Sequence, residues 1–177
     1  MEIIYSDRKT LAIEVKSSTK VVVRAPGHMS EARIMQWTDS RREWIARAQE
    51  KLAVKEELAG PPLTISDVAR LKADARVDFA TRISYWKDII GVHPVHVTIR
   101  NQSSRWGSCS ARKTISLNCQ LMRFDERERD YVIVHELCHL KEFNHGRRFR
   151  ALVKQYFPEY LLARKTLSEA LILKVEE

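Results

Sequence analysis

The sequence contains little glycine, proline or cysteine and no long run of apolar residues. Among its 177 residues are five Gly, five Pro and three Cys, while 44% of the residues are hydrophobic and 31% are charged. These proportions exclude a collagen-like chain, a disulfide-rich scaffold and a disordered polar chain. No segment approaches the roughly 18 consecutive apolar residues that a membrane-spanning helix needs. We therefore expect a globular protein of about one domain, with no membrane partner.

The cysteines and the charge indicate the compartment and the kind of partner. Cys109, Cys119 and Cys138 are an odd number, and the N-terminal segment MEIIYSDRKT has no apolar signal core. Both observations favour reduced thiols, so we expect a soluble, cytoplasmic protein. Lys and Arg number 31 against 23 Asp and Glu, which gives a formal net charge of +8. This excess favours polyanionic or acidic partners only weakly, because basic surfaces are commonly just solvated.

The first third of the chain predicts a β-hairpin followed by a helix. Runs with strand character span residues 11–15 and 20–24 and are joined by a turn-prone Ser-Ser-Thr segment. Spacings of three and four between apolar side chains then predict one helix over about 30–57. Trp37 and Trp44 share the apolar side of this helix, so we expect both of them in the core.

A Gly-Pro-Pro break at residues 60–62 separates this part from a second helix. Thr64 or Ser66 is expected to cap that helix, which ends near Gly91. Residues 95–100 then alternate between aliphatic and polar side chains and predict a strand. Two more short strands are expected at 105–109 and 114–119.

The last third of the chain is predicted to be helical. Asp125 is placed to cap a helix whose middle, residues 131–140, is apolar on nearly every side. Such a helix belongs in a protein interior. Residues 147–174 predict one or two further helices, divided near Pro158.

The buried helix carries His135-Glu136-Leu137-Cys138-His139, an HExxH pattern. Four residues of α-helix turn by about 400° and rise about 6 Å, so His135 and His139 project from one face and can reach one zinc ion. Glu136 is rotated by about 100° around the axis, which suits a general base better than a third ligand. The pattern also arises by chance, but two histidines and a glutamate buried without partners would cost several kcal/mol. A metal removes that cost.

A hydrolytic zinc site usually has three protein ligands, and His145 is the strongest candidate for the third. On an unbroken helix it would lie about 15 Å from His135 along the axis, too far to bind the same ion. We therefore predict that the helix ends near residues 143–144 and that Asn144 or Gly146 adopts a positive φ, which turns His145 back toward the metal.

Other third ligands remain open. A carboxylate from a later helix is an alternative, with Glu159 and Glu169 as candidates. The metzincin pattern is disfavoured because Glu142 stands where that pattern has Gly, and no Met follows Met122 to form its Met-turn.

The sequence resembles the YgjP-like metallopeptidases, a minimal zincin-fold family. The segments that carry the resemblance are residues 105–109 (RWGSC), 115–118 (ISLN), 131–139 (YVIVHELCH), 144–145 (NH) and 148–149 (RF). The resemblance implies an α+β fold, in which a small antiparallel or mixed sheet packs on the active-site helix. It also implies that His135, His139 and His145 bind zinc and that Glu136 is catalytic. On this basis we expect a single domain over 1–177, with an N-terminal hairpin and helices (1–91) and a zinc-binding catalytic core (92–177).

These residues predict a zinc-dependent hydrolase, a metallopeptidase in which zinc-activated water attacks the peptide and Glu136 is the general base. An extended substrate is expected to pair with an open strand edge, at either 95–100 or 105–109. The side chains considered for substrate binding or for stabilising the oxyanion are Arg105, Trp106, Asn118 and Tyr131.

Two other functions fit parts of the sequence. Some members of the YgjP-like family are described as nucleotide pyrophosphatases acting on UTP, and arginines 100, 105, 147, 148 and 150 suit a triphosphate. The sequence has no Gly-rich phosphate loop to support this nucleotide substrate. A structural zinc in a nucleic-acid-binding module is the second alternative, resting on basic residues 41, 42, 47 and 51, but no base-reading motif accompanies them.

Overall fold

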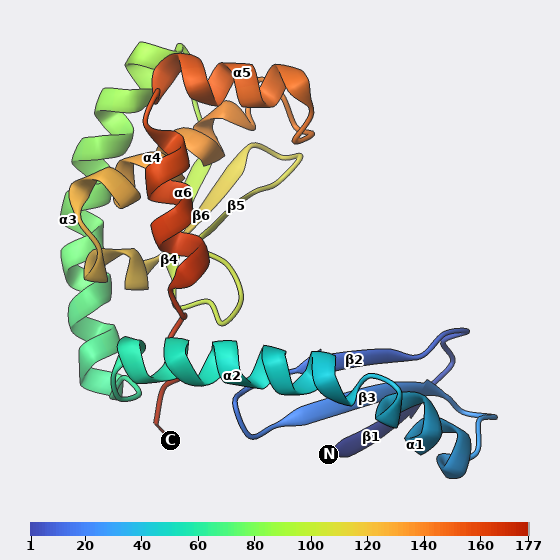
Figure 1. Ribbon diagram of the computed structural model, residues 1–177. Helices are drawn as coiled ribbons and strands as arrows, with labels where there is room; N and C mark the ends of the chain where they lie inside the picture. Colours follow the sequence, from blue (N-terminus) through green and yellow to red (C-terminus); the bar gives the residue numbers. More distant parts are fainter. Residues whose placement is uncertain (177) are drawn as a thin grey trace. The chain divides into compact units, whose positions relative to one another are not determined.

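A computed structural model describes residues 1–176, and the chain divides into two units at the Gly-Pro-Pro break. The first unit is Met1–Gly60 and the second begins at Pro61. Figure 1 shows the first unit in blue to teal and the second in green to red. Each unit has its own small sheet and its own buried cluster, so each is described by itself.

The first unit contains a three-stranded sheet in the order β1-β3-β2. Strands β2 (Ala12–Val15) and β3 (Val21–Pro26) are antiparallel, which confirms the predicted hairpin. Strand β1 (Glu2–Ser6) pairs in parallel with β3 and was not predicted. Val23 and Ala25 of β3 are fully buried and form the core of this unit with Ile34.

The single helix predicted over 30–57 is wrong, because the structure has α1 (Glu31–Asp39) and α2 (Arg42–Ala59). The Thr38 and Ser40 hydroxyls donate to the carbonyls of Ile34 and Trp37, and such local bonds compete with continued helix. The core position predicted for both tryptophans is also wrong for Trp44, which is 54% exposed. Trp37 is partly buried and packs against the core of this unit.

The second unit begins with the long helix α3 (Ile65–Ile90), whose ends confirm the sequence-based prediction. Thr64 accepts a hydrogen bond from the Asp67 backbone N–H while the Asp67 carboxylate accepts from the Thr64 N–H, which forms a capping box. At the other end Gly91 is in the left-handed region at φ 71°, which glycine adopts without steric cost. Between these caps Leu71 and Phe79 are buried in the core.

A small mixed sheet follows, in the order β4-β6-β5. Strand β4 (His96–Arg100) runs parallel to β6 (Thr114–Asn118), and β5 (Gly107–Cys109) runs antiparallel to β6. The central strand β6 buries Ile115 and Leu117, so β4 and β5 form the two edges. Asn118 ends β6 and caps the short 3-10 helix η1 (Cys119–Arg123) by accepting from the Gln120 backbone N–H.

Three helices complete the second unit: α4 (Glu126–Cys138), α5 (Arg147–Tyr156) and α6 (Tyr160–Glu169). Asp125 occupies the N-cap position of α4, as predicted, but its side chain makes no capping hydrogen bond, and Pro158 lies between α5 and α6 as predicted. Arg82 of α3 is ion-paired with Asp130 of α4 at 2.9 Å, which ties the two helices together. Figure 1 shows α4 between α3 and the sheet of β4, β5 and β6. The α+β fold with a small mixed sheet beside the HExxH helix is therefore confirmed.

Across residues 1–176, no helix combines the length and the apolar character that crossing a bilayer requires. The expected N-terminal part, residues 1–91, includes α3, which belongs to the unit that begins at Pro61. The grouping of the whole chain into one metallopeptidase domain stays a prediction.

Candidate metal centre

Helix α4 is buried on nearly all sides and carries the HExxH residues in its last turn. Val132, Ile133, Val134 and Leu137 are all buried, which fixes the rotation of the helix within the second unit. His135 and Glu136 lie in this last turn, and His139 is the C-cap residue in a helical conformation. The helix therefore ends at Cys138, earlier than the predicted end near residues 143–144.

The chain reverses after α4 through tight hydrogen bonds and not through a left-handed residue. The Leu140 N–H donates to the Leu137 carbonyl and the Lys141 N–H donates to the Cys138 carbonyl, both at 3.0 Å, which tightens the last turn. The Gly146 N–H then donates to the Asn144 carbonyl at 2.7 Å. The predicted positive φ is wrong, because neither Asn144 nor Gly146 has one. The reversal nevertheless brings His145 back to α4.

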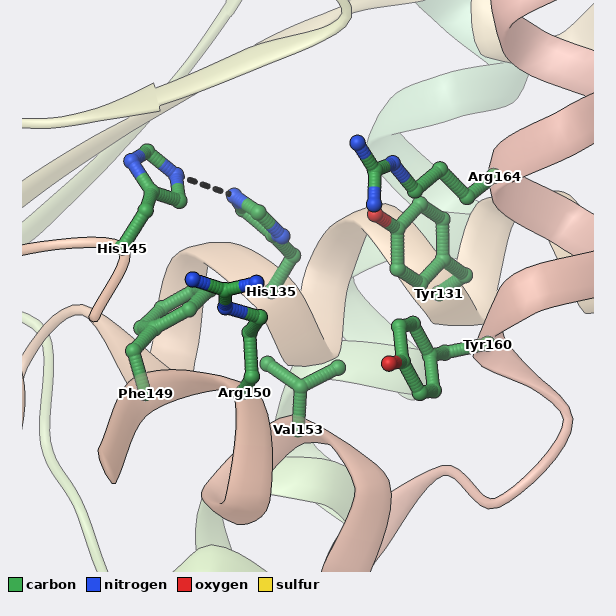
Figure 2. Close-up of a pocket in the computed structure, with 8 residues that line it drawn as sticks. All are labelled: Tyr131, His135, His145, Phe149, Arg150, Val153, Tyr160 and Arg164. Carbon is green, nitrogen blue, oxygen red and sulfur yellow. Dashed lines mark hydrogen bonds between the residues drawn. The ribbon is translucent and has the colours of Figure 1, made fainter. Parts of the chain in front are cut away.

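The three predicted ligands, His135, His139 and His145, converge. The His145 Nε2 atom lies 3.1 Å from His135 Nε2 and 3.2 Å from His139 Nε2 (Figure 2 shows the first of these contacts). Three nitrogens bound to one tetrahedral zinc at about 2.1 Å would lie roughly 3.4 Å apart. One N–H of His145 cannot donate to both neighbours, so a shared cation satisfies these nitrogens better than hydrogen bonds do. Glu159 and Glu169 do not belong to this group.

The surroundings of the imidazoles leave their lone pairs free for a cation. The Nδ1 of His139 faces the Glu142 carbonyl at 3.2 Å, and donation to that oxygen leaves Nε2 as the ligand atom. Burial lowers the pKa of His135 to about 3, with smaller contributions from the charges of His139 and His145. Burial is also the largest cause of the lowered pKa of His139. Both rings are therefore neutral at pH 7, the form that binds metals.

Phe149 of α5 supports all three rings and was not identified as a site residue from the sequence. Its ring stacks on His139 with centroids 4.3 Å apart, and it meets His135 and His145 at 4.8 and 4.9 Å. Phe149 is buried, so its packing restricts the rotamers of the imidazoles. The sequence signals for Phe149 were its place shortly after the last histidine and its membership of the RF segment that contributed to the family resemblance.

Glu136 lies beside the histidine cluster with an unusual environment for a carboxylate. Its side chain is 5% exposed, and its Oε2 atom is buried without a hydrogen-bond partner. Burial raises the pKa of Glu136 to about 8, and the positive charge of Arg105 opposes that rise. Gly107 of β5 packs directly against this side chain. A buried, unpaired acceptor of this kind is suited to take a proton from a reacting group.

The raised pKa of Glu136 predicts how pH changes the stability of the metal-free protein. Between pH 4.5 and pH 8 the folded state holds the Glu136 proton more tightly than the unfolded state, so the unfolding free energy falls as pH rises. The Glu136→Gln variant does not titrate and escapes this loss. Its unfolding free energy relative to wild type is expected to rise on the order of 3 kcal/mol between pH 5 and pH 8.

Urea unfolding in the presence of a chelator measures this difference. Glu159→Gln is the matched control, because it replaces an exposed glutamate outside the histidine group by the same amide. A pH-independent difference for Glu136→Gln would show that the carboxyl is ionised at ordinary pH in the folded protein.

Three hollows surround the histidines and Glu136. The strand cavity, of about 610 Å³, is lined by residues 104, 105 and 107–109 together with Glu136 and the three histidines. The middle cavity, of about 260 Å³, is lined by Trp106, Tyr131, His135, Glu136 and Arg164 among others. The helix cavity, of about 350 Å³, lies between α4, α5 and α6 beside His135 and His145. The histidine cluster can therefore be reached both from the β5 side and from the side of α5 and α6.

The structure brings three of the four predicted substrate-binding residues to these hollows. Arg105 lines the strand cavity, Trp106 the middle cavity and Tyr131 both the middle and the helix cavity. Asn118 is fully buried instead, and its amide nitrogen donates to the carbonyls of Gln102 and Arg105 at 2.9 and 3.0 Å. Asn118 thus holds the segment before β5 in place.

Trp106 and Tyr131 are also tied into the core. The Trp106 Nε1–H donates to the Leu167 carbonyl at 3.2 Å, and its ring meets Phe124 edge to face. Tyr131 packs edge to face on His135 and stacks on Tyr160 of α6. Both side chains therefore form walls of the cavities. Arg164 and Tyr160, which line the same space, carried no local sequence signal.

A helix that presents two histidines, a third histidine from the following turn, and a buried carboxylate beside an open cleft define a metal-dependent hydrolase. The family model of the YgjP-like metallopeptidase domain matches residues 56–170. The chain belongs to this YgjP-like family and is a metallopeptidase, which confirms the resemblance and the predicted enzyme class.

Similar solved structures include two metallopeptidase zymogens. Abylysin of Pyrococcus abyssi is 25% identical, with a TM-score of 0.48, over 55% of this chain and 98% of that chain. Jannalysin of Methanocaldococcus jannaschii is 25% identical, with a TM-score of 0.46, over 51% of this chain and 93% of that chain. Comparison with curated proteins gave no match.

Proposed function

We propose that this metallopeptidase uses zinc, held by His135, His139 and His145. The observation that carries the proposal is the convergence of the Nε2 atoms, with His145 Nε2 3.1 and 3.2 Å from the other two. Three imidazoles suit zinc and leave a fourth position open. Zinc bound there supplies a Lewis acid that polarises the peptide carbonyl and makes water more acidic.

In this proposal Glu136 is the general base. Glu136 lines both the strand and the middle cavity, and its buried Oε2 atom has no hydrogen-bond partner within the described residues. The carboxylate accepts a proton from the attacking water and later passes it to the leaving amine. The apolar packing around α4 leaves Glu136 5% exposed, which limits the contact of the carboxylate with bulk water.

We also propose that an extended peptide pairs with the free edge of β5. Strand β5 is at the edge of its sheet, and Gly107, Ser108 and Cys109 line the strand cavity with Glu136 and the three histidines. The other edge strand, β4, lines none of the three hollows. Backbone hydrogen bonds to β5 would therefore place a peptide bond beside the metal ligands.

The alternative functions lose much of their support. Of the arginines that suggested a nucleotide substrate, only Arg105 and Arg150 line these hollows. Two of the basic residues that suggested nucleic-acid binding, Arg42 and Arg47, are ion-paired with Asp39 and Glu43. A peptide or protein is therefore the proposed substrate. A cytoplasmic location stays a proposal, supported by three free cysteines.

Zinc binding by wild type and by His145→Ala tests the proposed function. Wild type is expected to bind zinc tightly and to cleave members of a peptide library, detected by mass spectrometry. Loss of one ligand should weaken zinc affinity at least on the order of 10²-fold in chelator competition, because even supporting residues contribute 10- to 100-fold. His93→Ala is the matched control, since His93 is exposed and outside the cluster.

Two results would contradict the proposal. Unchanged zinc affinity in His145→Ala would remove His145 from the metal centre. Hydrolysis of nucleoside triphosphates by zinc-loaded wild type, without cleavage of any library peptide, would replace the peptidase by a nucleotide hydrolase.

A further inference from the structure

The helix cavity beside the metal ligands carries two arginines that the catalytic proposal does not use. Arg150 comes from α5 and Arg164 from α6, and both line this cavity together with His135 and His145. Figure 2 shows the Arg150 and Arg164 side chains extending from different helices into the space beside His135. Tyr131 and Tyr160 form an aromatic wall next to them. Two guanidinium groups therefore face one hollow.

These two arginines differ from Arg82 of α3 and Arg129 of α4, which are neutralised by carboxylates. Arg82 is ion-paired with Asp78 and Asp130, and Arg129 is ion-paired with Asp78. Neither Arg150 nor Arg164 makes an ion pair with a carboxylate in the part of the chain that the structure describes. The lining of the helix cavity contains no Asp or Glu. The positive charge in this cavity is thus uncompensated by the protein.

A cation at the three histidines increases this excess of positive charge. Arg150 and Arg164 are exposed at the rim of this hollow and line it together with two of the histidines, so the positive charges around the helix cavity favour an anionic occupant over a neutral one. Arginine forks bind carboxylates with two parallel hydrogen bonds. The rings of Tyr131 and Tyr160 suit the methylene groups of an acidic side chain or the last side chain of a peptide.

We propose that Arg150 and Arg164 form a carboxylate-binding subsite, which directs cleavage to peptide bonds next to a negatively charged group. The group is either the side chain of Asp or Glu or the free C-terminal carboxylate. This inference rests on the proposed peptidase function, because it identifies the substrate of the same centre. The inference goes beyond the proposed function because it assigns substrate specificity to two residues outside the histidine cluster.

Paired peptides distinguish the two sources of the carboxylate. A peptide that the enzyme cleaves is made with Glu or Gln at each position next to the cleaved bond, and with a free or an amidated C-terminus. Wild type is expected to prefer one charged form by about 10- to 100-fold in kcat/KM, the range for hydrogen bonds to charged groups. Arg164→Gln and Arg150→Gln should each reduce that preference, measured in each variant as the ratio of kcat/KM for the charged peptide to kcat/KM for its neutral counterpart.

Arg148→Gln is the matched control, because Arg148 lies in α5 next to this site but lines none of the three hollows. It should retain the full preference for the charged peptide. Equal cleavage of charged and neutral peptides by wild type would overturn the subsite. An unchanged preference in both arginine variants would do the same.

Binding to a non-cleaving protein separates this inference from the peptidase proposal. Calorimetry with Glu136→Gln protein measures the affinity for the Glu and Gln peptides, with Arg164→Gln added in a double variant. Tighter binding of the charged peptide that depends on Arg164 supports the subsite even if wild type cleaves no peptide. Binding of UTP that depends on both arginines, without any preference between the peptides, would instead assign the cavity to a phosphate.

Discussion

Replacing Glu136 by glutamine is expected to lower kcat for peptide hydrolysis on the order of 10³-fold, while the zinc content stays unchanged. Glutamine keeps the size of the side chain but cannot accept a proton. Because Glu136 lies outside the group of three histidines, its loss should not release the metal. KM should change little, because the peptide is proposed to bind through backbone hydrogen bonds to β5 and Glu136 is not part of that strand. Steady-state kinetics on a cleaved library peptide, with metal analysis of the same samples, measures both quantities.

Glu159→Gln and Glu169→Gln are the matched controls for this experiment. These residues were the alternative carboxylate ligands considered from the sequence, and both are exposed and outside the histidine group. Each control should retain zinc and activity. Loss of zinc together with activity in Glu136→Gln would make Glu136 a ligand, and a kcat within tenfold of wild type would place the base elsewhere.

The metal centre was predictable from the sequence mainly because two of its histidines lie on one helical turn. The spacing of His135 and His139 fixes their common face once α4 is helical. The position of His145 after the helix was enough to predict it as the third ligand. The backbone path that brings His145 back to α4 was not predictable. Several hydrogen-bond patterns reverse a chain, and the structure uses short-range bonds around Leu137 and Asn144 where a positive φ was expected.

The fold was predictable where local signals were strong. Thr64 and Gly91 mark the ends of α3 because caps depend on neighbouring residues. The break between α1 and α2 was missed because the apolar spacing continues across Arg41 while the backbone leaves the helical region. The parallel pairing of β1 depends on contacts between distant segments, to which periodicity is insensitive.

The walls of the cleft were the least predictable part. Arg164 and Phe149 reach the centre only through the packing of α5 and α6 on α4, which no spacing in the sequence encodes. Gly107 drew attention as part of the RWGSC segment, but its role depends on a long-range contact. In the structure it is the point at which β5 meets the side chain of Glu136.

The second large effect is expected at Gly107. A Cβ at this position would lie 2.6 Å from Oε1 and 2.8 Å from Cγ of Glu136, closer than real Cβ contacts. Rotation of the carboxylate alone would not relieve this contact, because Cγ of Glu136 also clashes and Glu136 is 5% exposed. Gly107→Ala should therefore displace the carboxylate or the strand, and kcat/KM should fall on the order of 10²-fold, as for misplacements near 1 Å.

Zinc content and a control glycine separate this effect from general damage. The three atoms nearest to the added Cβ all belong to Glu136 and none to a histidine, so zinc affinity should be unchanged in Gly107→Ala. Gly27 has no heavy atom within 4 Å of its Cβ position, and Gly27→Ala should retain activity. Wild-type kinetics in Gly107→Ala would mean that β5 and α4 can separate without cost.

A double-mutant cycle on stability tests the contact without any measurement of activity. Gly107→Ala should destabilise the chelated protein by about 1–3 kcal/mol, the range for overpacking a close contact. The same change in a Glu136→Ala background should cost much less, because Cγ, Cδ and Oε1 are then absent. A coupling free energy near zero would show that the two residues do not meet. A coupling of about 1–3 kcal/mol would show that β5 holds the carboxylate in place, so that the strand proposed to bind the peptide also positions the base.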